Sequence, residues 1–165
     1  MAIPFMAVAP IQLAASMANN LRCNKIISII DPDQECPEFV GEHLVLRFHD
    51  ISHGYSASSR LQPPFGGHIH RLIEFARQMT PGDRVLVHCH MGVARSPAAI
   101  LIIAATLTGS AGQAIAALRS VIPSGLFKPN PRMISLADHQ LRMSGALEEA
   151  IVQPEAPAPH PSAIW

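Results

Sequence analysis

A chain of 165 residues is long enough for one domain with its own core, and its 48% hydrophobic and 15% charged residues exclude a disordered protein. The formal net charge of zero predicts no broad basic surface for nucleic acid or for an anionic membrane. The three cysteines, Cys23, Cys36 and Cys89, are too far apart for a disulfide framework or paired metal ligands, which favours a reducing compartment such as the cytoplasm.

The first 18 residues carry no charge, so the basic segment that opens a secretory signal peptide is missing. Pro4 and Pro10 interrupt this apolar stretch, and no run of 18 uninterrupted apolar residues occurs in the chain. We therefore expect no membrane span and interpret the stretch as the first strand and helix of the domain.

Strands and helices are predicted to alternate. Runs of β-branched residues or alternating apolar and polar residues predict strands at 5–9, 25–30, 43–48 and 84–88. Apolar residues at helical spacing, together with capping signals, predict helices at 10–20, 67–80, 97–107, 110–121 and 130–143. This order indicates an α/β protein with a mostly parallel central sheet and helices on both faces.

Two segments are expected to lie outside this regular structure. Residues 49–64 contain glycine, serines and prolines without any periodicity, and a loop of this length is often functional. Four prolines within 152–165 predict a disordered tail after a single domain of residues 1–151.

The last predicted strand is joined to an apolar helix by the segment His88-Cys89-His90-Met91-Gly92-Val93-Ala94-Arg95-Ser96. Backbone N–H groups of such a loop and the N-terminus of the helix attract an oxyanion, and Arg95 offers a planar fork of donors that suits phosphate. In this positive field Cys89 is expected as a thiolate, which is a nucleophile facing the phosphorus of a bound phosphate.

This segment resembles the signature of the protein tyrosine phosphatase superfamily, His-Cys-x5-Arg-Ser/Thr, in the form usual for the dual-specificity branch. The likeness is strong in residues 88–96, is weaker at Asp50 and Asn130, and is closest to small bacterial-type tyrosine phosphatases without accessory domains. It implies a dual-specificity-like fold and metal-independent hydrolysis of phosphotyrosine, with phosphoserine or phosphothreonine as further substrates. The reaction would proceed through a phospho-cysteine intermediate and without a cofactor.

The segment suggests a role for each of its residues. Cys89 is the expected nucleophile and Arg95 the expected phosphate ligand, and the substrate-binding residues are His90, Met91, Gly92, Val93, Ala94 and Arg95. Ser96 is well placed to donate a hydrogen bond to the thiolate, or alternatively to cap the helix. The resemblance further implies that His88 orients the loop and that Asn130 braces it from behind, although Asn130 is equally suited to be a helix N-cap.

Ester cleavage also needs an acid that protonates the leaving oxygen. The resemblance implies an Asp upstream of the signature at the end of a strand, and Asp50, at the start of the long loop, fits this description. Asp31 and Asp33 follow another predicted strand and are the alternatives, and Asp50 could instead be a turn or cap residue.

The expected partner is a phosphorylated protein or a small phosphomonoester. Residues 90–94 contain no Lys, whereas phosphoinositide-directed members of the superfamily often have Lys there, so the resemblance disfavours the polyanionic head group of a phosphoinositide. The alternatives are a phosphate-binding or phosphopeptide-binding module with weak catalysis, or a phosphatase for a non-protein phosphomonoester. Two further alternatives are a metal pair formed by His88 and His90 with Cys89, and a protective disulfide between Cys89 and Cys23 or Cys36.

Overall fold

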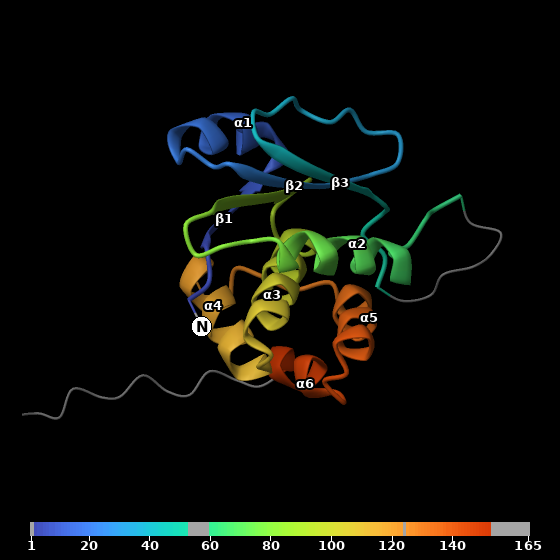
Figure 1. Ribbon diagram of the computed structural model, residues 1–165. Coiled ribbons are helices and arrows are strands. Elements are labelled where there is room, and N and C mark those ends of the chain that lie inside the picture. Colours follow the sequence, from blue (N-terminus) through green and yellow to red (C-terminus); the bar gives the residue numbers. More distant parts are fainter. Residues whose placement is uncertain (1, 53–59, 124, 153–165) are drawn as a thin grey trace, which may run out of the picture.

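A parallel sheet forms the centre of the computed structural model, which describes residues 2–52, 60–123 and 125–152 (Figure 1). Its four strands are β1 (Phe5–Pro10), β2 (Lys25–Ile30), β3 (Glu42–Arg47) and β4 (Arg84–Cys89), in the spatial order β1-β4-β2-β3. All neighbouring strands are parallel, with Pro10 opposite Cys89 and Ser28 opposite His88. The carboxyl ends of these strands therefore meet at one edge of the sheet, and Cys89 ends an inner strand there.

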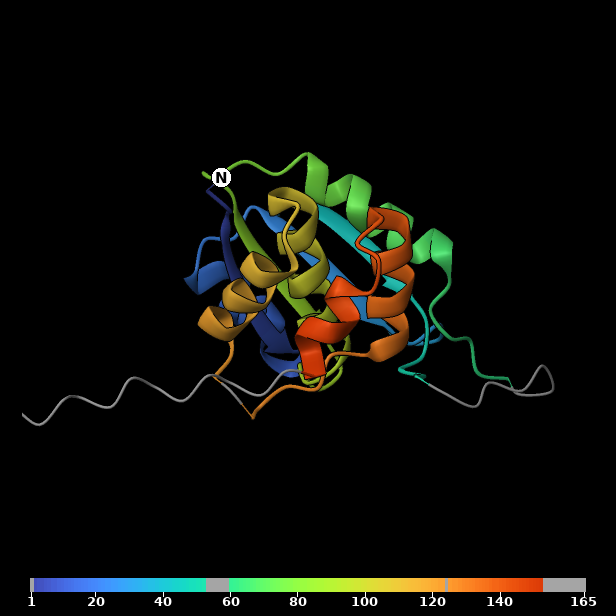
Figure 2. The same ribbon diagram turned by 90° about the horizontal axis from the view of Figure 1, so that it is seen from below.

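Helices cover both faces of the sheet, as the sequence predicted (Figures 1 and 2). Helix α1 (Ile11–Asn20) covers one face, where Ala14 and Ala18 pack with the small and β-branched residues of β1 and β2. The other face holds the larger core and the remaining helices: α2 (Gly66–Arg77), α3 (Arg95–Thr108), α4 (Ala111–Val121), α5 (Pro131–Leu141) and α6 (Ala146–Val152). The predicted α/β class is thus confirmed.

Helix α3 is the centre of the larger layer. Every residue from Arg95 to Ala105 is buried, which explains why residues 97–105 are apolar on all sides of the helix. The N-terminus of α3 lies at the same sheet edge as Cys89, because the helix begins directly after the loop that follows β4. The packing of α3 therefore fixes the position of Arg95 and Ser96.

The C-terminal part corrects the expected boundaries. Helix α5 ends at Leu141, and Arg142 adopts a left-handed conformation with φ of 56°. A further helix, α6, follows and buries Leu147 against the core, and the carboxylate of Asp138 accepts from the backbone N–H groups of Gly145 and Leu147. The sequence analysis missed α6, because a helix of two turns shows little periodicity. Helix α6 extends to residue 152, and the residues after it lie outside the described part of the chain, so the domain boundary and the tail stay predictions.

Within the described part of the chain, no helix is long and apolar enough to cross a membrane.

Candidate active site

The loop of residues 90–94 follows β4 and is held at three points by backbone hydrogen bonds. The N–H of Ile11 donates to the carbonyl of His90 at 3.2 Å, and those of Lys128 and Asn130 donate to the carbonyls of Val93 and Ala94 at 2.9 and 3.1 Å. The loop is therefore fixed from the start of α1 on one side and from the segment before α5 on the other.

Gly92 is required by the shape of this loop. Its φ is +75°, a conformation that side chains rarely adopt, and an added Cβ would lie 3.3 Å from the carbonyl carbon of Ala9. In this conformation the N–H of Gly92 donates to Sγ of Cys89 at 3.2 Å. The sulfur of Cys89 thus has a backbone N–H donor, and the loop that contains this donor leads directly into the N-terminus of α3.

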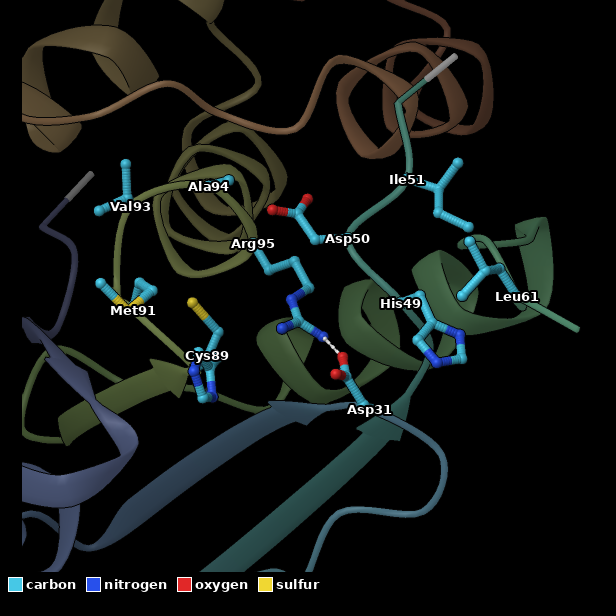
Figure 3. Close-up of a pocket in the computed structure, with 11 residues that line it drawn as sticks. Asp31, His49, Asp50, Ile51, Leu61, Cys89, Met91, Val93, Ala94 and Arg95 are labelled. Atoms are coloured by element: carbon cyan, nitrogen blue, oxygen red, sulfur yellow. Dashed lines mark hydrogen bonds and ion pairs between the residues drawn. The ribbon is translucent and has the colours of Figure 1, made fainter. Parts of the chain in front are cut away.

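Cys89, Asp50 and Arg95 line a single cavity of about 590 Å³ (Figure 3). Cys89 is 3% exposed, and both Cys89 and Arg95 line this cavity. The cavity is large enough for a phosphate and part of the group that carries it. Its complete lining is Asp31, His49, Asp50, Ile51, Leu61, Cys89, His90, Met91, Val93, Ala94 and Arg95.

Arg95 is buried and reaches across the end of the sheet. Its Nη1 donates to Oδ1 of Asp31 at 2.7 Å and to the backbone carbonyl of Phe48 at 2.8 Å. Its Nε is also buried but has no hydrogen-bond partner among the described residues. The guanidinium thus keeps an unused donor at the candidate site.

Asp50 and Asn130 are brought into contact from distant parts of the chain. The Nδ2 of Asn130 donates to Oδ1 of Asp50 at 2.6 Å and to the carbonyl of Ile51 at 3.3 Å. The Oδ1 of Asn130 accepts from the N–H of Met133 at 3.1 Å, so this residue is also the N-cap of α5. Asn130 therefore caps α5 and contacts the Asp50 segment through its side chain, whereas only its backbone N–H reaches the loop after Cys89, at Ala94; its bracing of that loop stays a prediction.

Ser96 corrects one expectation. It is fully buried, and α3 begins at Arg95, so the N-cap residue is Ala94 and the capping alternative for Ser96 is wrong. The helix begins two residues earlier than predicted because Arg95 and Ser96 form its first turn ahead of Pro97. The hydroxyl of Ser96 has no hydrogen-bond partner among the described residues, and its predicted role toward the thiolate stays a prediction.

His88 faces away from the cavity into a buried polar cluster. Its Nε2 lies 2.6 Å from Oγ of Ser28, which also contacts Nε2 of His43 at 2.7 Å. Burial lowers the pKa of His88 to about 4, so the imidazole is neutral near pH 7. These contacts connect the residue before Cys89 to β2 and β3.

The surroundings of the two histidines and of the three cysteines bear on the alternatives of a metal site and a disulfide. His88 is turned toward Ser28 and His90 is exposed, and the described residues contain no group of three or more His, Cys, Asp or Glu side chains that could hold a metal. Cys23, Cys36 and Cys89 are free thiols, and the sulfur of Cys36 lies 3.9 Å from Nε2 of His43.

His49, Ile51 and Leu61 were not predicted to line the cavity, and Asp31 was predicted only as an alternative acid. These residues follow β2 and β3, and no motif marks them. The one available signal was that the strands end at a common edge, which draws the residues after each strand toward the same place.

No family model matches the chain. Its sequence is 32% identical over 152 residues to protein phosphatase Slingshot homolog 3 from Rattus norvegicus, an alignment that covers 87% of this chain and 22% of that protein. The chain therefore spans about a fifth of the length of this curated relative.

The solved structures that resemble the chain are matched over more than nine-tenths of their own length. A single-residue variant of human DUSP28 superposes with a TM-score of 0.61 at 18% identity, over 86% of this chain and 92% of that one. PTPMT1 in complex with PI(5)P superposes with a TM-score of 0.60 at 15% identity, over 86% and 93% of the two chains. The fold is that of the dual-specificity phosphatases, and over 87% of its length the chain resembles a protein phosphatase in sequence. Assignment to the bacterial type stays a prediction.

Proposed function

We propose that this chain is a metal-independent phosphomonoesterase that acts on phosphotyrosine in proteins, with phosphoserine and phosphothreonine as further substrates. The observation that carries the proposal is the meeting of the Cys89 sulfur, the unused donor edge of Arg95 and the Asp50 carboxyl group in one cavity at the N-terminus of α3. A nucleophile, an oxyanion site and an acid are the groups that phosphate ester cleavage requires.

The first step transfers the phosphoryl group to the enzyme. The thiolate of Cys89 attacks phosphorus, the bond from phosphorus to the ester oxygen breaks, and the leaving oxygen takes a proton from Asp50. The Oδ1 of Asp50 accepts from Asn130, so the proton is best placed on Oδ2. The guanidinium of Arg95 and the N–H groups of the loop hold the phosphoryl oxygens.

The second step releases phosphate. Water gives a proton back to Asp50 and its oxygen forms a bond to phosphorus, while the bond from sulfur to phosphorus breaks and the thiolate returns. A hydrogen bond from the buried hydroxyl of Ser96 would stabilise Cys89 as the leaving group. In this scheme Asp50 is the acid of the first step and the base of the second, and the two steps restore both residues.

The charge of the cavity favours substrates with one phosphate group. Arg95 is the one Lys or Arg side chain among the described residues that line it, while Asp31 and Asp50 add carboxylates. Met91 and Val93 line the cavity and are 66% and 41% exposed, which suits an aromatic or aliphatic group next to the phosphate. A head group with several phosphates would lack the cations that it needs, although PTPMT1 is described in complex with PI(5)P.

The proposal is tested with wild type and Cys89→Ser on an aryl phosphate, a phosphopeptide panel and phosphoinositides. We expect wild type to hydrolyse the aryl phosphate and phosphotyrosine peptides in the presence of EDTA, and Cys89→Ser to bind phosphate without turnover. Binding without turnover by wild type would instead indicate a phosphate-binding module. Hydrolysis by Cys89→Ser at the wild-type rate would contradict the mechanism, as would activity that EDTA removes and Zn²⁺ or Mg²⁺ restores.

A further inference from the structure

Arg95 uses one end of its guanidinium to bind the protein. Its Nη1 donates to Oδ1 of Asp31 and to the carbonyl of Phe48, and these two residues directly follow β2 and β3. The side chain of Arg95 is 5% exposed and that of Asp31 is 38% exposed, so the ion pair lies at the wall of the cavity with its acidic partner toward solvent.

The other edge of the guanidinium is turned toward the nucleophile. Figure 3 shows the nitrogen bound to Asp31 on one side of Arg95 and the rest of the guanidinium on the side of Cys89. Of that edge, Nε is buried and has no partner among the described residues. A buried N–H without an acceptor is costly, so this one fits a site whose acceptor arrives with the ligand.

A guanidinium binds phosphate most specifically through two N–H groups on one edge. Nε and Nη2 form such an edge, and a contact through Nη1 leaves it available. If Asp31 competed with phosphate, its carboxylate would be expected on the edge that faces Cys89. It occupies the far end instead, so it restricts rotation of the guanidinium without covering the donors that phosphate would use.

We propose that Asp31 is a positioning residue that anchors Nη1 of Arg95 and thereby presents the Nε–Nη2 edge to the phosphate. This inference rests on the proposed function, because it assigns Arg95 to phosphate binding. The inference also assigns the carboxylate of Asp31 a role other than proton transfer. Binding is strengthened because the orientation of the guanidinium is set before the ligand arrives.

The test compares Asp31→Ala with Asp31→Asn, both in the Cys89→Ser background, by calorimetric titration with inorganic phosphate. Asp31→Ala removes the anchor, and we expect about tenfold weaker binding, since the carbonyl of Phe48 still holds Nη1. Asp31→Asn keeps an oxygen acceptor without the charge, and we expect binding within about threefold of the background. The control is Glu35→Gln, which removes one negative charge from an exposed residue of the same loop. This control should not change phosphate binding.

A second readout follows Arg95 itself. In wild type the Nε–H of Arg95 should give a slowly exchanging NMR signal, assigned by its loss in Arg95→Lys. In Asp31→Ala it should exchange about tenfold faster or broaden, and in Asp31→Asn it should persist. Equal or tighter phosphate binding by Asp31→Ala would show that Asp31 competes with the ligand. An unchanged Arg95 signal would show that Asp31 does not act through Arg95, and either result overturns the proposal.

The outcome is separable from that of the proposed function. If wild type hydrolyses no phosphomonoester while Asp31→Ala still weakens phosphate binding, the enzymatic proposal fails and the role of Asp31 stands. If wild type is active and both Asp31 variants bind phosphate like the background, only the role of Asp31 fails. Thermal unfolding of each variant identifies a folding defect. If Asp31→Ala does not fold, Asp31→Asn provides the test, because a more than tenfold loss of phosphate affinity in Asp31→Asn would contradict the anchoring role of Asp31.

Discussion

Replacing Asp50 by Asn tests the assignment of the acid most directly. The substitution removes the proton that the leaving oxygen would take and preserves the size of the side chain. An amide oxygen can still accept from Nδ2 of Asn130, which lies 2.6 Å from Oδ1 of Asp50, so the loop should keep its position. A loss of activity in Asp50→Asn would then report the missing proton and not a displaced loop.

The magnitude depends on the leaving group. General acid catalysis contributes about 10² to 10⁴ in rate, and a tyrosyl oxygen needs the proton more than an electron-poor phenol does. We therefore expect kcat for a phosphotyrosine peptide to fall about 10² to 10⁴-fold, and kcat for an activated aryl phosphate to fall about tenfold or less. The basic arm of the pH–rate profile, which reports loss of the acid's proton, should flatten.

The assay is steady-state hydrolysis of both substrates from about pH 4 to pH 9, with thermal unfolding as a check of folding. An equal loss for both leaving groups, with the basic arm retained, would refute Asp50 as the acid and leave it a structural role. Asn130→Ala is a useful companion, because it keeps the carboxyl group but removes its donor. That variant should lower activity less than Asp50→Asn does, since the proton itself remains.

Two further predictions concern Arg95 and His88. Arg95→Lys keeps the charge but not the bidentate edge, so kcat/KM on an aryl phosphate should fall about 10² to 10³-fold, and near wild-type kinetics would contradict the proposed phosphate contact. The pKa of buried His88 is lowered to about 4, so the unfolded state binds its proton first as the pH falls. The contribution of His88 to the free energy of unfolding should thus be fully present above about pH 6.5, and about 3 kcal/mol of it should be lost by pH 4, as measured by urea titrations. A His88→Asn variant with the same pH dependence as wild type would refute this cause.

Much of the fold could be predicted from the sequence because its elements have strong local signals. The strand over 25–30 was predicted with its observed bounds, and Asn130, for which a helix N-cap was one of two expected roles, caps α5. The errors are where local signals are weak. Residues 146–152 are too few for a clear period, and the start of α3 was placed at Pro97 although Arg95 and Ser96 already form its first turn.

The sequence by itself determined where the candidate chemistry lies: the alternating pattern placed a loop after a buried strand, and this loop carries Cys89, Gly92 and Arg95, from which a phosphate site is predicted. Only the tertiary structure decided which residues meet them. Asp31 lies 64 residues from Arg95 and Asp50 lies 80 residues from Asn130 along the chain, yet both pairs are in contact. The first contact follows from the strand order, which brings the ends of β2, β3 and β4 to one edge, and no local pattern encodes that order. The second contact depends on the segment before α5, whose Asn130 N–H donates to the carbonyl of Ala94 at the same edge.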